Sequence, residues 1–298
     1  MFEGFEEFNI AVTPDVTIHG IKCGTGPPLL LLHGFPQTHH IWHKITPSLT
    51  PSLTVIALDL RGYGRSSKPP SSAQQNHAPY SKSVMASDCV TVMSSLGFKK
   101  FSICSHDRGA RVAHKLCVDA PESVERVMFL DIAPTLAMFE KTDMQFATAY
   151  WHWFFLIQPS PFPETLLMTV FWRRVWGKSE KKEIWDEQAL AEYMRQFEDR
   201  EGVHAMCEDY RAAATIDLEE ARKDQGEGRK IMCPVRVLVG AKGVVAMKFD
   251  FLKEWRDVSE GMVTGEPVDS GHYIAEENPD VLLKHIKGFL GDPERVRL

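Results

Sequence analysis

The turn centred on Asp107 is the sequence feature that most constrains the fold of this chain. Residues 101–104 are a short apolar run of the kind that forms a buried strand. Residues 112–117 place apolar side chains at the spacing of one helix face. Between these segments, the small residues Ser105 and Gly109 lie on either side of the aspartate. The pattern predicts a strand, a sharp turn and a helix, with a carboxylate at the tip of the turn.

This carboxylate stands where such a turn usually presents a nucleophilic serine. A serine that attacked a saturated carbon would form an ether, which water does not open. An aspartate forms an alkyl ester instead, and water can later attack the carbonyl carbon of that ester. Asp107 therefore indicates displacement at an alkyl carbon, either removal of a halide or opening of an epoxide. An aspartate that merely caps a helix is the alternative interpretation of this residue alone.

Strand and helix patterns alternate on both sides of this turn, and they predict a mostly parallel α/β sheet covered by helices. The alternation stops near residue 135 and resumes near residue 230. The residues between these points are rich in aromatic side chains and helical in pattern. We therefore predict a core formed by residues 1–134 and 230–298, with an inserted helical cap at residues 135–229.

Composition and charge exclude several classes of function. The formal net charge of −6 provides no basic field for a nucleic acid or an anionic membrane. The apolar runs are far shorter than a bilayer requires, and the acidic N-terminal residues do not form a signal-peptide pattern. The 6 cysteines form no Cys-x-x-Cys pair and mostly lie in apolar patterns. We expect a cytoplasmic protein with reduced thiols that uses no metal and no cofactor.

A nucleophilic aspartate needs a base that activates water and an acid that orients this base. His272 lies between the last predicted core strand and the last helix, where it completes the chain order nucleophile, acid, histidine. The loop at residues 240–243 contains no carboxylate. Asp131, at the end of the strand that follows the nucleophile, is therefore the predicted acid. A solvated loop histidine and a structural aspartate before Pro134 are the alternatives.

Two further groups are expected beside Asp107. The backbone N–H groups of Phe35 and Arg108 are predicted to stabilise the negative charge that develops on the Asp107 carboxyl during ester hydrolysis. Arg108 and Arg111 can face one side of a helix start, where they could hold a substrate carboxylate in bidentate fashion. Solvated arginines on a helix surface are the alternative. The pair predicts a small anionic substrate.

These segments together resemble the fluoroacetate dehalogenases, which form the haloacetate dehalogenase group of the α/β-hydrolases. The matching segments are residues 33–38, 106–111, 131–135, 150–153, 158–159, 206–211 and 270–273. The resemblance covers nearly the whole chain. Its most specific part is His-Asp-Arg-Gly-Ala-Arg at residues 106–111, because haloalkane dehalogenases and epoxide hydrolases typically carry tryptophan after the nucleophile.

The resemblance implies an α/β-hydrolase fold with an eight-stranded sheet, a homodimer, and hydrolysis of short 2-haloacids to 2-hydroxy acids through an aspartyl ester. It implies the following roles: nucleophile, Asp107; base, His272; acid, Asp131; carboxylate clamp, Arg108 and Arg111; halide pocket, His152, Trp153 and Tyr210. The three halide-pocket side chains each donate a hydrogen bond, which a poor leaving group such as fluoride needs.

Other functions stay open at this point. An epoxide hydrolase would use the same ester chemistry and would protonate the alkoxide with tyrosines such as Tyr150, Tyr193 or Tyr210. A hydrolase-fold protein that acts on a non-halogenated substrate, or a receptor without catalysis, would keep the fold without dehalogenation. A carboxylesterase is disfavoured because no serine occupies the centre of the turn at Asp107.

Overall fold

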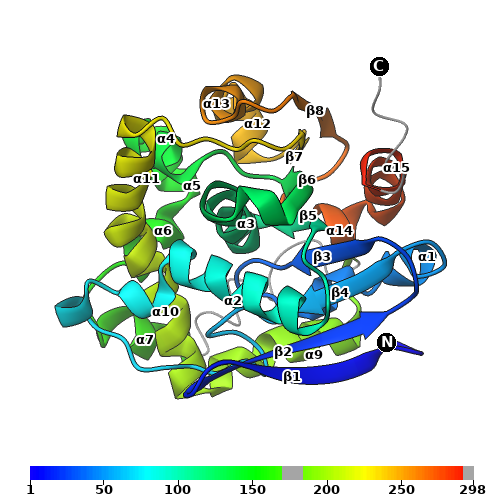
Figure 1. The fold of residues 1–298 in the computed structure, drawn as a ribbon. Helices are drawn as coiled ribbons and strands as arrows, with labels where there is room; N and C mark the ends of the chain where they lie inside the picture. Colours follow the sequence, from blue (N-terminus) through cyan, green and yellow to red (C-terminus); the bar gives the residue numbers. More distant parts are fainter. Residues whose placement is uncertain (170–183, 291–298) are drawn as a thin grey trace.

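The computed structural model describes residues 1–169 and 184–290. Eight strands form one sheet in the order β1-β2-β4-β3-β5-β6-β7-β8 (Figure 1). The strands are β1 (Glu6–Thr13), β2 (Val16–Cys23), β3 (Pro28–Leu32), β4 (Thr54–Leu58), β5 (Phe101–His106), β6 (Val124–Leu130), β7 (Val235–Gly240) and β8 (Val263–Val268). The pairs β1–β2 and β2–β4 are antiparallel, and the other pairs are parallel. The predicted α/β fold class is confirmed.

The apolar sequence of β3 explains why this strand lies in the middle of the sheet. Successive side chains of a strand point to opposite faces. Leu30 and Leu32 belong to the apolar layer on one face of the sheet, whereas Leu29 and Leu31 belong to the layer on the other face. A strand buried on both faces needs such a continuous apolar run.

Helices cover both faces of the sheet. On one face, α2 (Lys82–Ser95), α3 (Asp107–Asp119) and α13 (Phe251–Asp257) contribute to the first apolar layer. On the other face, α1 (Thr46–Leu49), α14 (Ile274–Glu277) and α15 (Pro279–Phe289) contribute to the second. A further short helix, α12 (Val244–Lys248), follows β7. In the parts of the chain that the structure describes, no helix has the length and apolar character needed to cross a membrane.

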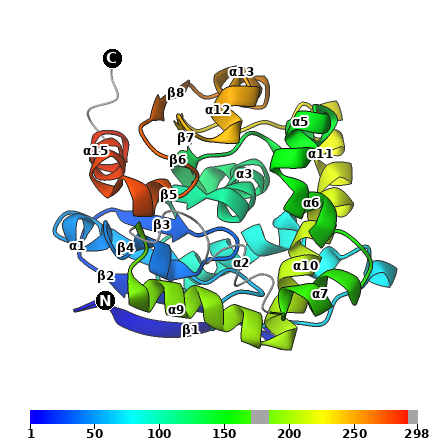
Figure 2. The ribbon, with the colours of Figure 1, turned by 180° about the vertical axis from the view of Figure 1, so that it is seen from behind.

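The described residues between β6 and β7 form helices and no strand. The helices are α4 (Thr135–Glu140), α5 (Met144–Ala149), α6 (Trp151–Leu156), α7 (Phe162–Leu167), α9 (Glu187–Arg195), α10 (Arg200–Ala214) and α11 (Ile216–Gly226). Figure 2 shows α5, α6, α7, α10 and α11 gathered on one side of the molecule. We propose that residues 135–229 form the cap. Residues 170–183 of this predicted segment lie outside the described residues.

Candidate active site

The turn between β5 and α3 holds Asp107 in a backbone conformation that side chains rarely adopt. Its φ angle is +45°, in the left-handed region. Close packing enforces this turn. A Cβ atom on Gly109 would lie 2.3 Å from the carbonyl oxygen of His33, and one on Gly34 would lie 2.4 Å from the Cβ of Asp107. The two glycines therefore let the nucleophile turn and the loop after β3 touch each other.

The two carboxylate oxygens of Asp107 have different surroundings. Its Oδ1 accepts a hydrogen bond from the backbone N–H of Phe35, at 2.9 Å. Its Oδ2 lies 4.0 Å from Nε2 of His272, which is longer than a hydrogen bond. Burial alone would raise the pKa of Asp107, but the neighbouring His272, His106, Arg108 and Arg111 lower it from its usual value. The carboxylate is therefore ionised, with one oxygen fixed and one directed towards the histidine.

The structure brings His272 and Asp131 together. Nδ1 of His272 lies 2.7 Å from Oδ2 of Asp131. The other oxygen of Asp131 accepts a hydrogen bond from the backbone N–H of Gly240, at 2.8 Å, so the end of β7 orients the acid. Burial by itself lowers the pKa of His272, but the hydrogen bond and charge of Asp131, with the charge of Asp107, raise it above 6.5. This arrangement suits a base that accepts a proton at Nε2.

Two residues that the sequence did not single out hold the backbone around His272. The carboxylate of Glu277 accepts hydrogen bonds from the N–H groups of Gly271, at 2.7 Å, and Tyr273, at 3.2 Å. Nε2 of His106 lies 2.9 Å from the carbonyl oxygen of His272. The position of Glu277 in a short helix just after the histidine is the one signal that could have indicated this role.

Arg108 differs from the prediction that both guanidinium groups are available to a substrate. Its Nε and Nη2 donate to the two carboxylate oxygens of Asp209, at 3.0 and 2.8 Å. Asp209 also accepts a hydrogen bond from Tyr63, at 2.7 Å, and pairs with Lys82. The guanidinium lies over the ring of Tyr210, with its Cζ 4.3 Å from the ring centroid. One edge of Arg108 is thus occupied by the protein, which leaves Nη1 for a ligand.

Arg111 has no such carboxylate partner among the described residues. Its Nη1 donates to Oγ1 of Thr135, at 2.7 Å, and its Nη2 lies 3.2 Å from the sulfur of Met138. Its Cζ lies 4.7 Å from the ring centroid of Trp153. The side chain is 2% exposed, and burial together with the charge of Arg108 lowers its pKa to about 10. A buried cation that no carboxylate pairs with directly favours the binding of an anion.

The structure also gathers the side chains of the predicted halide pocket. His152 and Trp153 come from α6, and Tyr210 comes from α10. The ring centroid of Tyr210 lies 6.1 Å from that of His152 and 6.5 Å from that of Trp153. Nε1 of Trp153 is buried and has no hydrogen-bond partner among the described residues. A buried N–H group without a partner is costly, so an acceptor from a ligand fits here.

A cavity of about 420 Å³ lies beside Asp107 and His272. Its lining includes Phe35, Asp107, Asp131, His152, Tyr210 and His272. Arg108 and Trp153, which are each 1% exposed, are almost completely buried beside these lining residues. Arg111 does not line the first cavity and instead lines a second one of about 290 Å³, among residues of α3, α4, α11 and α13. Only the first cavity contains Asp107 and His272.

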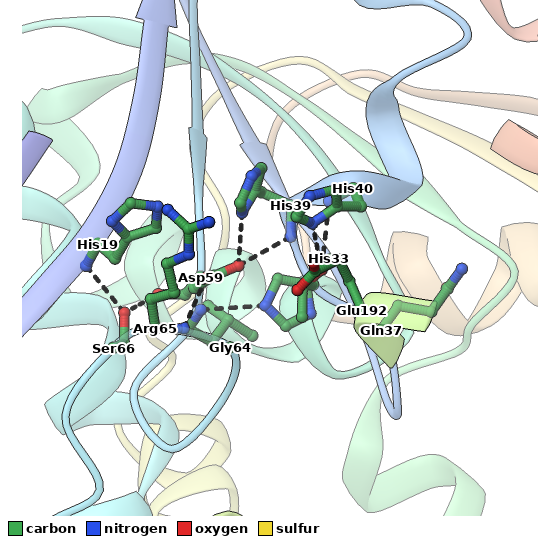
Figure 3. Close-up of polar contacts among 12 residues, drawn as sticks. His19, His33, Gln37, His39, His40, Asp59, Gly64, Arg65, Ser66 and Glu192 are labelled. Atoms are coloured by element: carbon green, nitrogen blue, oxygen red, sulfur yellow. Dashed lines mark hydrogen bonds and ion pairs between the residues drawn. The ribbon is translucent and has the colours of Figure 1, made fainter. Parts of the chain in front are cut away.

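A buried polar network supports the loop that carries the Phe35 N–H (Figure 3). Asp59 accepts hydrogen bonds from the backbone N–H of His39 at 2.9 Å, from Nδ1 of the same residue at 2.8 Å, and from the N–H of Arg65 at 2.9 Å. His19, His39 and Asp59 also place potential metal-ligand atoms within 4.8 Å of one another. The carboxylate oxygens of Asp59 are already engaged, so we assign the group to supporting the loop.

Comparisons with known proteins identify a family and several relatives of this chain. The alpha/beta hydrolase fold family matches residues 27–183. A fluoroacetate dehalogenase from a Burkholderia species is 41% identical, over 98% of this chain and 96% of the relative. A soluble epoxide hydrolase from a Corynebacterium species is 29% identical, over 89% of this chain and 91% of the relative.

Solved structures agree with this placement. A protein structure from Nostoc sp PCC 7120 is 49% identical, with a TM-score of 0.92, and the match covers 97% of this chain and 99% of that one. The epoxide hydrolase CorEH is 28% identical, with a TM-score of 0.84, and the match covers 96% and 98%. The predicted resemblance to fluoroacetate dehalogenases and the predicted hydrolase class are confirmed. The chain belongs to the alpha/beta hydrolase fold family.

Proposed function

We propose that the protein hydrolyses short 2-haloacids to 2-hydroxy acids and halide through an ester on Asp107. The observation that carries this proposal is the contrast between the two oxygens of Asp107. Oδ1 is held by the N–H of Phe35, whereas Oδ2 lies near His272 and faces the cavity that also contains His152 and Tyr210. The relative named fluoroacetate dehalogenase supports the same chemistry.

Substrate binding would use the unpaired charge of Arg111 and the remaining Nη1 of Arg108. A carboxylate held between the two guanidinium groups has its α-carbon beside Asp107. The buried position of both arginines strengthens these charge-assisted hydrogen bonds, because little water competes with them. Asp209 holds Arg108 in place before the substrate arrives, so less entropy is lost on binding.

In the first chemical step, Oδ2 of Asp107 attacks the α-carbon and the carbon–halogen bond breaks. The halide leaves on the side opposite to the attack, where His152, Trp153 and Tyr210 are the proposed hydrogen-bond donors. The partnerless Nε1 of buried Trp153 is the donor best suited to a halide, because an indole N–H donates a hydrogen bond but accepts none. The three donors stabilise the charge as it develops on the leaving group.

In the second step, His272 takes a proton from water at Nε2, and the water oxygen attacks the side-chain carbonyl carbon of Asp107. Negative charge then develops on Oδ1, which the N–H groups of Phe35 and Arg108 stabilise. The bond between this carbon and Oδ2 breaks, the departing oxygen takes the proton from His272, and the 2-hydroxy acid leaves with the original Oδ2. Asp131 stabilises the protonated imidazole in between.

Halide release from fluoroacetate, chloroacetate and bromoacetate tests the proposal. We expect release from at least one of them and none from the Asp107→Asn variant, whose amide is a poor nucleophile. A single turnover in heavy-oxygen water with enzyme in excess should place the label in Asp107. Absence of halide from all three substrates, or label that enters only the product, would contradict the proposal. We also propose that the protein is cytoplasmic and that it forms a homodimer. Measurement of its molecular mass in solution tests the homodimer.

A further inference from the structure

We propose that the same cavity also hydrolyses short epoxides whose ring carries a carboxylate, such as glycidate, to dihydroxy acids. This inference rests on the site of the proposed function, since it uses the same nucleophile and the same anion-binding arginines. It goes beyond dehalogenation because the leaving group is an alkoxide that stays attached to the substrate. The site therefore has to supply a proton as well as a hydrogen bond.

The first step of the argument concerns the donors at the leaving-group position. A halide ion is stable once it accepts hydrogen bonds, but an alkoxide is strongly basic and needs a proton. Trp153 donates only a hydrogen bond, whereas the phenol of Tyr210 can transfer its proton. Tyr210 and Asp107 line the same cavity, and the ring of Phe35 lies edge-on to Tyr210 with centroids 5.3 Å apart. The site thus contains a proton donor, Tyr210, which the departure of a halide does not require.

The second step concerns the strength of this acid. Burial raises the pKa of Tyr210 well above its usual value near 10, and the charge of Asp107 raises it further. Arg108, with its Cζ 4.3 Å from the ring centroid, works in the opposite direction and stabilises a phenolate when one forms. Such a tyrosine keeps its proton in the resting site and gives it up only to a stronger base, as an alkoxide is.

The third step concerns selectivity for a carboxylate. Arg111 is buried, and no carboxylate among residues 1–169 and 184–290 pairs with it. An epoxide without an anionic group would leave this cation uncompensated in the occupied site. Glycidate provides the missing charge on the carbon next to the ring. Its C2 then takes the place of the α-carbon of a haloacid.

The reaction balances with water as the only co-reactant. Oδ2 of Asp107 attacks C2, the C2–O bond breaks, and the oxygen left on C3 takes the proton of Tyr210. His272 then takes a proton from water, the hydroxide cleaves the ester, and the oxygen that leaves on C2 takes the proton back from His272 to give glycerate. The carboxylic acid formed at Asp107 loses its proton, and the phenolate of Tyr210 regains one through solvent. The net change is glycidate plus water to glycerate.

The experiment compares five substrates under one condition: fluoroacetate, chloroacetate, bromoacetate, glycidate and glycidol, which has a hydroxymethyl group in place of the carboxylate. Halide release and NMR detection of the diol products give the rates, with Asp107→Asn as the blank for spontaneous opening. We expect glycidate turnover and at least about a 10-fold lower kcat/KM for glycidol. A buried charge that the substrate leaves unpaired reduces the stabilisation of the bound state by a kcal/mol or more.

Tyr210→Phe and the matched control Tyr80→Phe test the proton donor. The hydroxyl of Tyr80 is also buried, but it donates to the backbone of Pro69, away from the cavity. We expect Tyr210→Phe to lower kcat/KM for glycidate by about 100-fold or more and that for bromoacetate by less than 10-fold, because only the alkoxide needs a proton. Equal losses for both substrates would overturn the assigned role of Tyr210.

The outcomes separate this inference from the proposed function. Halide release without any glycerate overturns the inference and leaves dehalogenation intact. Glycerate formation without halide release supports the inference and overturns dehalogenation as the function. Glycidol that reacts as fast as glycidate overturns the role of the arginines. No turnover of any of the five substrates overturns both proposals.

Discussion

At the scale of single residues, the environment of each carboxylate decides its role. Asp107 and Asp131 each follow directly after a strand, and both have positive φ angles, at +45° and +52°. Asp107 keeps one oxygen directed at the cavity, as a nucleophile needs. Both oxygens of Asp131 are bound, to Gly240 and His272, so it can orient a base but cannot attack a substrate. Asp209 accepts hydrogen bonds from Arg108 and Tyr63 and pairs with Lys82, so its role is to hold Arg108 in place.

Asp209→Asn tests this dependence of Arg108 on its partner. The variant keeps the shape of the side chain but removes the negative charge that compensates Arg108 and Lys82. We expect the free energy of unfolding to fall by about 3–5 kcal/mol and KM for a haloacetate to rise, because a buried charge loses its partner. Urea unfolding and steady-state kinetics measure the two effects.

Asp217→Asn is the matched control for this variant. Asp217 is also buried and lies 3.5 Å from the amine of Lys82, but it makes no contact with Arg108 among the interactions described above. It should lower stability without changing KM. Equal changes of KM in the two variants would show that Asp209 acts through stability alone.

Glu277→Gln tests the electrostatic support of the base. Asp131, Asp107 and Glu277 all raise the pKa of His272. The base works only when it is unprotonated, so activity is lost as pH falls through this raised pKa. Removal of the Glu277 charge should lower the pKa and move the acid limb of the kcat/KM profile to lower pH. Glu266→Gln, which removes a half-exposed charge paired with Arg236, is the control and should leave the limb in place.

At the scale of elements, the strands were predictable because their signal is local. The run at residues 28–32 can be buried on both faces only as an interior strand, and the structure places it there. After β7, the pattern of residues 249–255 predicts a helix, and it occurs as α13 (Phe251–Asp257), shifted by two residues. The preceding α12 was missed because its sequence begins with two valines, which favour strands, and it is only five residues long.

The candidate site was less predictable where its contacts join distant segments. Phe35 could be inferred as a donor because the loop after β3 lies beside the nucleophile turn in this fold. The bond between Arg108 and Asp209 spans 101 positions and links the core to α10, so no local pattern indicates it. The same holds for Tyr193, whose hydroxyl donates to Glu276, at 2.8 Å.

Gly109→Ala tests the contact between α3 and the loop after β3. The added Cβ would meet backbone atoms at 2.3 Å, which cannot move aside as a side chain can. We expect lower stability and at least about a 100-fold loss of activity, because small displacements of a nucleophile are costly. Gly288→Ala is the control: it lies in α15 with nothing within 4 Å of the added atom, and it should stabilise the protein by about 0.4–1 kcal/mol. Unchanged activity in Gly109→Ala would contradict the close contact between α3 and the loop after β3.

At the scale of the whole molecule, buried charges in the described residues are mostly compensated by partners that lie next to them in space. Arg61 and Asp88 form two hydrogen bonds of 2.7 Å, and Arg108 is compensated by Asp209. The net charge of −6 repels an anion at long range, so the attraction for a carboxylate substrate has to come from the cations at the cavity. Several desolvated histidines follow the opposite rule, because they avoid the cost of an unsolvated charge by staying neutral.

These neutral histidines predict a loss of stability in mild acid. Burial lowers the pKa of His40 and His106 to about 3 and that of His114 to about 4, from 6.5 in the unfolded chain. Between about pH 4 and 6.5 the unfolded state therefore binds protons that the folded state does not. Each such histidine should lower the free energy of unfolding by up to about 1.4 kcal/mol per pH unit between 6.5 and its pKa in the folded state.

His114→Leu isolates one of these groups, because other titrations are common to variant and parent. The ring of His114 packs edge-on against Phe129 and Trp255, outside the catalytic cavity, so a leucine can replace its apolar contacts. Urea unfolding at pH 5, 6 and 7.5 should show a shallower loss of stability in the variant, by about 1.4 kcal/mol per pH unit between pH 5 and 6. Parallel slopes for the two proteins would mean that His114 is protonated in the folded state, and the packing of its ring would then have to accommodate a charge.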